Sequence, residues 1–196
     1  SHFETASGLD SQNDYVTLRD MAILTRYALQ YDILRTIAKT TTYDCTTVDK
    51  TKTFHLEATN RLLFTPASTG SQQTVSYEYE YATGFKTGYT TRAKGCLVAT
   101  AEKDGRTLIA LLFGDASSGQ WERYELAADL FDFGFQKYQN VPLTDFSSEE
   151  LYVEVIGGAV VDGKAEKMKC VPVSKTGSRY ITVPSDMNLS DVEYAV

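Results

Sequence analysis

Residues 84–101 read GFKTGYTTRAKGCLVATA, and a second apolar run follows at residues 106–114. The two runs are separated by Glu102-Lys103-Asp104-Gly105. An Asp-Gly pair between two apolar runs is a typical signal of a tight β-hairpin. The sequence therefore predicts two paired strands, at 95–101 and 106–114. Because residues 108–113 are all apolar, we expect the second strand to be buried on both faces.

Lys86, Thr87 and Gly88 stand shortly before this hairpin and combine three properties that suit an anionic ligand. Lysine supplies a compact positive charge, and threonine supplies a directional hydroxyl donor. Glycine lets a ligand approach the backbone closely. The N–H of the next residue, Tyr89, is then expected to face a developing oxyanion. The same tripeptide recurs at Lys175-Thr176-Gly177, where nothing continues the pattern and a plain β-turn is predicted.

Upstream of this region the sequence predicts loops, short helices and two short strands. Thr17 has the position of a helix N-cap, with Asp20 three residues later and an apolar face at helical spacing beyond it. The predicted elements are a loop at 1–16, helices at 17–28 and 32–38, a Thr-rich loop at 40–53, a strand at 54–57, a polar insertion at 65–73 and a strand with alternating tyrosines at 75–81. Downstream, residues 119–138 have the apolar spacing of a helix.

The pattern of apolar and turn-forming residues changes after residue 140. Short alternating segments at 151–156, 168–173 and 180–183 are separated by turns that contain Gly-Gly, Asp-Gly and Thr-Gly. This pattern predicts a small all-β domain at 141–196, expected to be incomplete, after an α+β domain at 1–140.

Composition argues against several classes of protein. The 196 residues carry a net charge of −7, which does not suit a nucleic-acid-binding surface. Cys45, Cys96 and Cys170 are widely spaced without a C-x-x-C pair, so neither a zinc site nor a redox motif is predicted. Cys96 lies in an apolar run and is expected to be a small buried residue. His2 and His55 are interpreted as local hydrogen-bonding residues, and no metal or other cofactor is expected.

The order of these motifs resembles that of the low-molecular-mass penicillin-binding proteins, the serine D-alanyl-D-alanine carboxypeptidases of the peptidase S11 type. In that family G-x-K-T-G-Y-T is followed by C-L-V-A-S-A and a Lys/Arg-Asp-Gly hairpin, and residues 84–105 follow that order. Residues 1–10, 15–28, 59–63 and 130–135 are similar to further segments of the family, with its N-T-N-x-L-L element at 59–63. The similarity extends over roughly residues 1–140.

The resemblance implies both a fold and a function. The fold is a penicillin-binding-protein or β-lactamase-like transpeptidase domain, an antiparallel sheet with flanking helices, followed by a small all-β domain. The function is removal of the terminal D-Ala from peptidoglycan stem peptides through an acyl-enzyme that β-lactams trap. Lys86, Thr87 and Gly88 match the family's substrate-binding motif, and Tyr89 matches the residue whose backbone N–H belongs to the oxyanion hole. The family works outside the cytoplasmic membrane, so an extracytoplasmic location is implied.

The family's nucleophile motif, S-x-x-K, is missing from these residues. No lysine has a serine three positions before it, and the one S-x-N, at 11–13, aligns with a loop and not with the family's second motif. We therefore expect a missing N-terminal half, or a second chain, as a partner, and we predict that this chain alone is inactive. It is also expected to expose apolar surface where that half packs.

Two alternatives stay open at this point. The first is a non-catalytic homologue that lacks the nucleophile and binds peptidoglycan or another protein through the groove beside Lys86. The second is a β-lactamase relative, because β-lactamases share the Lys-Thr-Gly strand. The context of residues 84–101 and the β-rich tail favour the carboxypeptidase.

Overall fold

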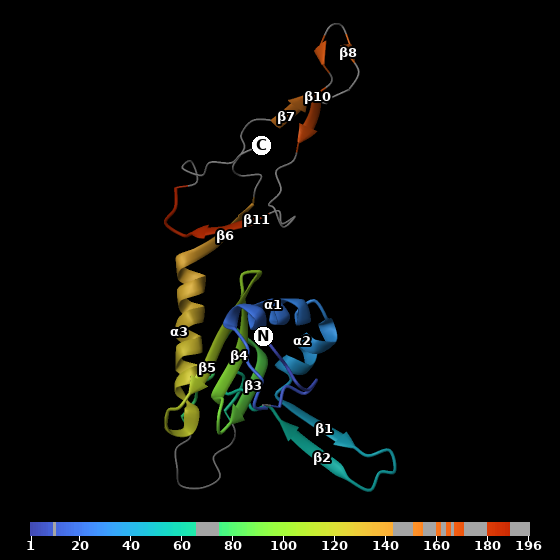
Figure 1. Cartoon of the computed structure of the whole chain (residues 1–196), viewed down its shortest axis with the longest axis vertical. Helices are drawn as coiled ribbons and strands as arrows, with labels where there is room; N and C mark the ends of the chain where they lie inside the picture. Colours follow the sequence, from blue (N-terminus) through green and yellow to red (C-terminus); the bar gives the residue numbers. More distant parts are fainter. Residues whose placement is uncertain are drawn as a thin grey trace. The chain divides into compact units, whose positions relative to one another are not determined.

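A computed structural model of the chain describes residues 1–9, 11–65, 75–142, 151–154, 160–161, 164–165, 167–170 and 180–188 (Figure 1). The chain divides into two units, Ser1–Asp132 and Phe133–Val196. The second Lys-Thr-Gly tripeptide at 175–177 lies outside the described residues, as do most of the insertion at 65–73 and the ends of the expected strands at 151–156 and 168–173.

The centre of the first unit is an antiparallel sheet of three strands, in the order β3, β4, β5. Their bounds are Ala82–Thr90, Lys94–Lys103 and Arg106–Asp115. The predicted hairpin is confirmed, because Lys103 pairs with Arg106 across Asp104 and Gly105. Both turn residues have positive φ angles, 50° and 71°, as a type I′ turn requires.

Strand β4, and not β5, is the buried strand of this sheet. Leu97, Ala99, Thr100 and Ala101 are fully buried, whereas Ala110 is the one buried residue of β5. The prediction that β5 is buried on both faces is therefore wrong. A continuous apolar run indicates that a strand packs against apolar residues. Which strand is buried on both faces depends on the strand order, and β4 is the middle strand.

Helices cover both faces of the sheet. On one face lies α2 (Asp32–Lys39), since a Cβ added to Gly84 of β3 would meet the Ala38 carbonyl oxygen at 2.8 Å. On the other lies α3 (Glu122–Lys137), since a Cβ added to Gly95 of β4 would meet the Arg123 side chain. The pleat of the strands agrees, because Gly84 pairs with Thr100, which points to the opposite face from Gly95.

The helix predicted at 17–28 is α1 (Leu18–Ala28), which contacts β5. Its predicted N-cap is confirmed, because the Thr17 hydroxyl accepts a hydrogen bond from the Asp20 N–H at 3.1 Å. This bond satisfies one of the backbone donors that the first turn of a helix leaves without a partner.

The Thr-rich segment expected to be a loop contains a strand. Strand β1 (Thr42–Thr46) pairs antiparallel with β2 (Thr53–Glu57), and the two form a separate hairpin (Figure 1). The loop prediction is wrong for residues 42–46. All but one of the residues in these two strands are exposed, so the sequence lacks the apolar alternation that marks a strand with one buried face.

Asp44 and His55 face each other across this hairpin. His55 Nδ1 hydrogen-bonds the Asp44 carboxylate, and its Nε2 lies 3.8 Å from Glu57 Oε1. The hydrogen bond with Asp44, aided by the negative charges of both carboxylates, raises the pKa of His55 above its usual value of 6.5. Because the folded pKa is the higher one, the pair stabilises the hairpin below pH 6.5 and its contribution is lost as the pH rises through the folded pKa.

An NMR titration of the His55 ring is expected to give a midpoint above pH 6.5. Asp44→Asn is expected to lower that midpoint, because the hydrogen-bonded charge that favours the imidazolium is removed. Asp49→Asn is a matched control, since Asp49 lies in the turn of the same hairpin and accepts hydrogen bonds from Thr47 and Thr51. A His55 midpoint that Asp44→Asn leaves in place would contradict the assignment.

Residues 75–81 are not a strand, contrary to the prediction. The tyrosines of this segment are more buried than the residues between them. Tyr77 stacks on Trp121 at 5.6 Å, and Tyr79 packs on Phe131 at 5.4 Å, both measured between ring centroids. The Tyr79 hydroxyl also donates to Asp132 at 2.8 Å. The alternation of tyrosines with polar residues therefore reflects packing against α3 and against Trp121, the residue before it. Residues 75–81 do not pair with a strand among the described residues.

The second unit contains short antiparallel pairs in its described part. Strand β6 (Tyr138–Pro142) pairs with β11 (Tyr180–Pro184), and Val141 and Val183 are buried. The remaining pairs are β7 (Leu151–Glu154) with β10 (Lys167–Cys170), and β8 (Val160–Val161) with β9 (Lys164–Ala165). Helices with antiparallel sheets, followed by these pairs, match the predicted α+β class.

The outer sides of α1 and α2 expose large apolar side chains. Ile23, Tyr27, Ile33 and Ile37 are each more than half exposed. Between α2 and the β1–β2 hairpin lies a groove of about 580 Å³ whose apolar lining includes Ile33, Ile37 and Leu56. Exposed apolar patches of this kind mark contact surfaces. Within the described residues, each helix is too short or too polar to cross a membrane.

Candidate functional site

The predicted site residues lie on the outer strand of the sheet. Lys86 pairs with Val98 and Thr87 pairs with Leu97 of β4. Neighbouring residues of a strand point to opposite faces, so the Lys86 side chain leaves β3 on the side of α1 and α2, and Thr87 leaves it on the side of α3. Among the described strands, β3 pairs with β4 alone, and its other edge is not part of a sheet.

Lys86, Thr87 and Gly88 border a cavity of about 500 Å³. Its lining includes aromatic and aliphatic side chains of the N-terminal segment, α1 and β5, namely Phe3, Tyr15, Val16, Met21 and Phe113. Lys86 is the one cation among the lining residues that the structure describes. The border of this mostly apolar cavity carries one cation, Lys86, and one carboxylate, Asp14. Such a cavity suits a small ligand whose negative group binds at Lys86.

Two hydrogen bonds hold the side chains of this strand. The Lys86 ammonium donates to the Thr87 carbonyl oxygen, which bends the long side chain along its own strand. The Thr87 hydroxyl hydrogen-bonds the hydroxyl of Thr59, which follows β2 in the chain. We did not predict a site role for Thr59. Its place in the Thr-Asn-x-Leu-Leu segment at 59–63 was the available signal.

Tyr89 occupies a different position from the other three predicted site residues. It pairs with Gly95, its side chain is 56% exposed, and it does not line the cavity beside Lys86. The side chain therefore takes no part in that cavity. The predicted role concerns the backbone N–H at the edge of β3, and it stays a prediction.

Cys96 lies directly across from Gly88 on β4. The expectation of a buried cysteine is wrong, because Cys96 is half-buried and lines the cavity, with its thiol 3.5 Å from the Ala93 carbonyl oxygen. The apolar run at 96–99 predicts burial correctly from Leu97 onward. Cys96 is less buried because it lines the cavity, whereas the neighbouring residues Gly95 and Leu97 are buried.

The N-terminal segment is held against the site by contacts that the sequence did not predict. Arg92, in the turn between β3 and β4, donates to the Ser11 carbonyl oxygen at 2.6 Å. Asp14 accepts hydrogen bonds from the backbone N–H groups of Glu4 at 2.7 Å and Ser11 at 3.0 Å. These bonds shape the polar loop into one wall of the cavity.

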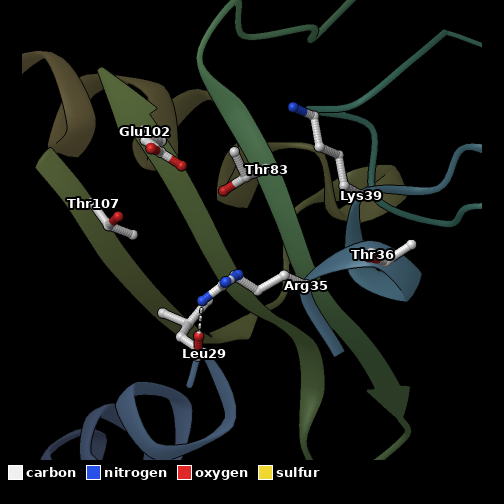
Figure 2. Close-up of a pocket in the computed structure, with 7 residues that line it drawn as sticks. All are labelled: Leu29, Arg35, Thr36, Lys39, Thr83, Glu102 and Thr107. Carbon is white, nitrogen blue, oxygen red and sulfur yellow. Dashed lines mark hydrogen bonds between the residues drawn. The ribbon is translucent and has the colours of Figure 1, made fainter. Parts of the chain in front are cut away.

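A second cavity, of about 520 Å³, lies at the hairpin end of the sheet (Figure 2). Its walls carry Arg35 and Lys39 from α2 and Glu102 from β4. Figure 2 shows the Arg35 guanidinium extended toward Leu29, whose carbonyl oxygen accepts its hydrogen bond, and Asp32 forms an ion pair with the same side chain. One of the two cations of this cavity, Arg35, is therefore engaged by Leu29 and Asp32. The cavity beside Lys86 is taken as the candidate site because it carries the Lys86-Thr87-Gly88 tripeptide on its border.

The described residues contain no group of three side chains suited to holding a metal ion. A serine three residues before a lysine is absent from all 196 residues. The chemistry that these side chains can perform is recognition of a negatively charged group by the Lys86 ammonium and the Thr87 hydroxyl.

The comparisons with known proteins agree on one family. The sequence profile of the peptidase S11 family, D-alanyl-D-alanine carboxypeptidase, matches residues 1–117. D-alanyl-D-alanine carboxypeptidase DacF of Bacillus subtilis is 34% identical over 142 residues, which are 72% of this chain and 32% of DacF. A D-alanyl-D-alanine carboxypeptidase of Streptomyces sp. strain K15 is 30% identical over 139 residues, 69% of this chain and 43% of that protein.

Solved structures place the fold in the same group. The Streptomyces K15 DD-transpeptidase superposes with a TM-score of 0.58 at 31% identity, over 69% of this chain and 47% of that one. Penicillin-binding protein 6B from Escherichia coli has a TM-score of 0.58 at 21% identity, over 94% of this chain and 43% of that one, which bears on the fold alone. The chain spans between 32% and 47% of the length of these relatives. It belongs to the peptidase S11 family of D-alanyl-D-alanine carboxypeptidases.

Proposed function

We propose that this chain supplies the substrate-carboxylate site of a serine D-Ala-D-Ala carboxypeptidase. The substrate is the D-Ala-D-Ala end of a peptidoglycan stem peptide, and its terminal carboxylate binds the Lys86 ammonium and the Thr87 hydroxyl. The observation that carries the proposal is the cavity at the outer strand of the sheet, which has Lys86, Thr87 and Gly88 on its border.

The geometry of β3 supports a particular position for the peptide. Because Lys86 and Thr87 point to opposite faces, one carboxylate reaches both groups at the edge of the strand and not over either face. The Lys86 ammonium already bends onto the strand backbone, as that position requires. An extended peptide at this edge pairs with the open backbone groups of β3, and Gly88 leaves room for close approach.

The reaction needs a serine that lies outside these 196 residues. Its hydroxyl oxygen attacks the carbonyl carbon of the penultimate D-Ala, the amide C–N bond breaks, and the proton passes to the amine of the leaving D-Ala. Water then hydrolyses the acyl-enzyme ester. The backbone N–H of Tyr89 stabilises the negative oxygen formed in each step. A β-lactam opens its ring on the same serine, and the resulting ester persists.

The partner that brings this serine is the N-terminal part of the same protein or a second chain. The exposed apolar side chains of α1 and α2, together with the apolar lining of the Lys86 cavity, support a contact with such a partner. This chain alone is therefore inactive. The intact enzyme works outside the cytoplasmic membrane, where its peptidoglycan substrate lies.

Labelling with a fluorescent penicillin tests the proposal. The protein that includes the serine-bearing part is expected to form a covalent adduct that survives denaturing electrophoresis, whereas this chain alone forms none. Pretreatment with unlabelled penicillin is the control and is expected to abolish the adduct. An adduct on this chain alone, or no adduct on the protein that carries an S-x-x-K motif, would refute the proposal.

A second candidate is a homologue that binds peptidoglycan without cleaving it. The absence of S-x-x-K and of an aligned S-x-N from the 196 residues is the observation that favours it. The two functions differ in one result. A binder retains a stem peptide ending in D-Ala-D-Ala and releases no D-alanine, whereas the enzyme releases D-alanine.

A further inference from the structure

The contact between Thr59 and Thr87 joins two residues 28 positions apart in the sequence. Their hydroxyl oxygens are within hydrogen-bonding distance, and either one has the geometry of the donor. Thr59 lies two residues after the end of the β1–β2 hairpin, and the intervening Ala58 N–H donates to the Thr41 carbonyl oxygen at 2.7 Å. The Thr59 hydroxyl, which belongs to a separate segment of the chain, therefore contacts the Thr87 side chain of β3, the strand that also carries Lys86.

The backbone of Thr59 is hydrogen-bonded by a residue of α3. Its carbonyl oxygen accepts a hydrogen bond from the Tyr124 hydroxyl at 3.1 Å, and Tyr124 is 1% exposed. The Arg123 guanidinium donates to the same Tyr124 oxygen at 3.2 Å. On the other side of Thr59, the Asn60 side chain accepts from the Leu62 N–H at 3.1 Å, and both residues are buried. A backbone held on both sides gives the Thr59 hydroxyl a defined place.

We propose that Thr59 is a positioning residue that acts through Thr87. The Thr59 hydroxyl donates its proton to Thr87 Oγ1, which holds the Thr87 side chain in one rotamer. A hydroxyl has one proton and two acceptor sites, so Thr87 keeps its own proton for a group at the edge of β3. A chain of two hydroxyls also polarises the outer donor and strengthens its bond to an anion. The inference rests on the proposed function in one respect, that this anion is the substrate carboxylate.

The first test measures the Thr87 rotamer and needs no activity. In this chain, the three-bond couplings of the Thr87 γ-methyl carbon to the backbone nitrogen and carbonyl carbon are expected to indicate one rotamer. Thr59→Val, which keeps the shape and removes the hydroxyl, is expected to give values averaged over rotamers. Thr59→Ser is the matched control, because it retains the hydroxyl and is expected to preserve the single rotamer.

The second test measures the rate of labelling by fluorescent penicillin in the protein that includes the serine-bearing part. Thr59→Val is expected to slow labelling about tenfold, the change that corresponds to a hydrogen bond of about 1.4 kcal/mol. Thr59→Ser is expected to restore the rate. On a Thr87→Val background, Thr59→Val is expected to add no further loss, because the two hydroxyls act as one unit.

The outcomes separate this inference from the proposed function. A protein with the serine-bearing part that fails to react with penicillin refutes the proposed function, and the Thr87 couplings still decide whether Thr59 positions that side chain. A single Thr87 rotamer in Thr59→Val, or unchanged labelling by that variant, overturns the role of Thr59. An added loss on the Thr87→Val background overturns it as well, because Thr59 would then act on the ligand directly.

Discussion

Replacing Lys86 with alanine is expected to slow penicillin labelling of the serine-containing protein by at least about thirtyfold. Removing one partner of a buried, hydrogen-bonded charge pair costs about 2–5 kcal/mol, and 1.4 kcal/mol corresponds to a factor of about ten. Lys86 is exposed in this structure, and we expect the bound ligand to bury its ammonium. Lys86 is the one cation among the described residues that border the cavity, so the bound carboxylate loses its only counter-charge there. Labelling rates measured over a range of penicillin concentrations give the second-order constant that this prediction concerns.

The same substitution is expected to leave the fold in place. Lys86 is exposed, and its ammonium hydrogen-bonds the carbonyl of the next residue in the strand, so the change in unfolding free energy is expected to stay within about 0.5 kcal/mol. Lys175→Ala is the matched control, because Lys175 begins the second Lys-Thr-Gly tripeptide. Equal losses in Lys86→Ala and Lys175→Ala, or full activity in Lys86→Ala, would contradict the assignment of the site.

Gly84→Ala is expected to destabilise the first unit by about 3 kcal/mol. Gly84 has a φ angle of 130°, a conformation that residues with a side chain rarely adopt, and this strain costs about 1–3 kcal/mol. The added Cβ would also lie 2.8 Å from the Ala38 carbonyl oxygen, and overpacking of this kind costs about 1–3 kcal/mol. The obstacle is the backbone of α2, which has to move away from β3.

Urea denaturation followed by the fluorescence of Trp121, the one tryptophan of the chain, measures this loss in the first unit. Gly105→Ala is the matched control. Gly105 also has a positive φ, 71°, but its Cβ would meet nothing within 4 Å, so the expected loss is about 1 kcal/mol. If the two variants unfold at the same urea concentration, α2 does not pack against Gly84 as described.

Much of the fold was predictable because its signals are local. The Thr17 cap, the helices α1, α2 and α3, and the Asp104-Gly105 turn each depend on residues within a few positions of one another. The order of motifs at residues 84–105 also identified the strand that carries Lys86, Thr87 and Gly88. These features depend on backbone preferences and on the spacing of apolar residues, which the sequence contains directly.

Tertiary structure decided the rest, because burial and contact depend on which segments meet. The apolar run of β5 gave no sign that β4 is the middle strand, and the alternating tyrosines at 75–81 reflect packing near α3 instead of pairing. The hydroxyl pair of Thr59 and Thr87 spans 28 residues, a distance over which chain spacing alone specifies no contact. The sequence by itself determined the local elements and the strand of the candidate site, and the packing of separate segments determined what surrounds that strand.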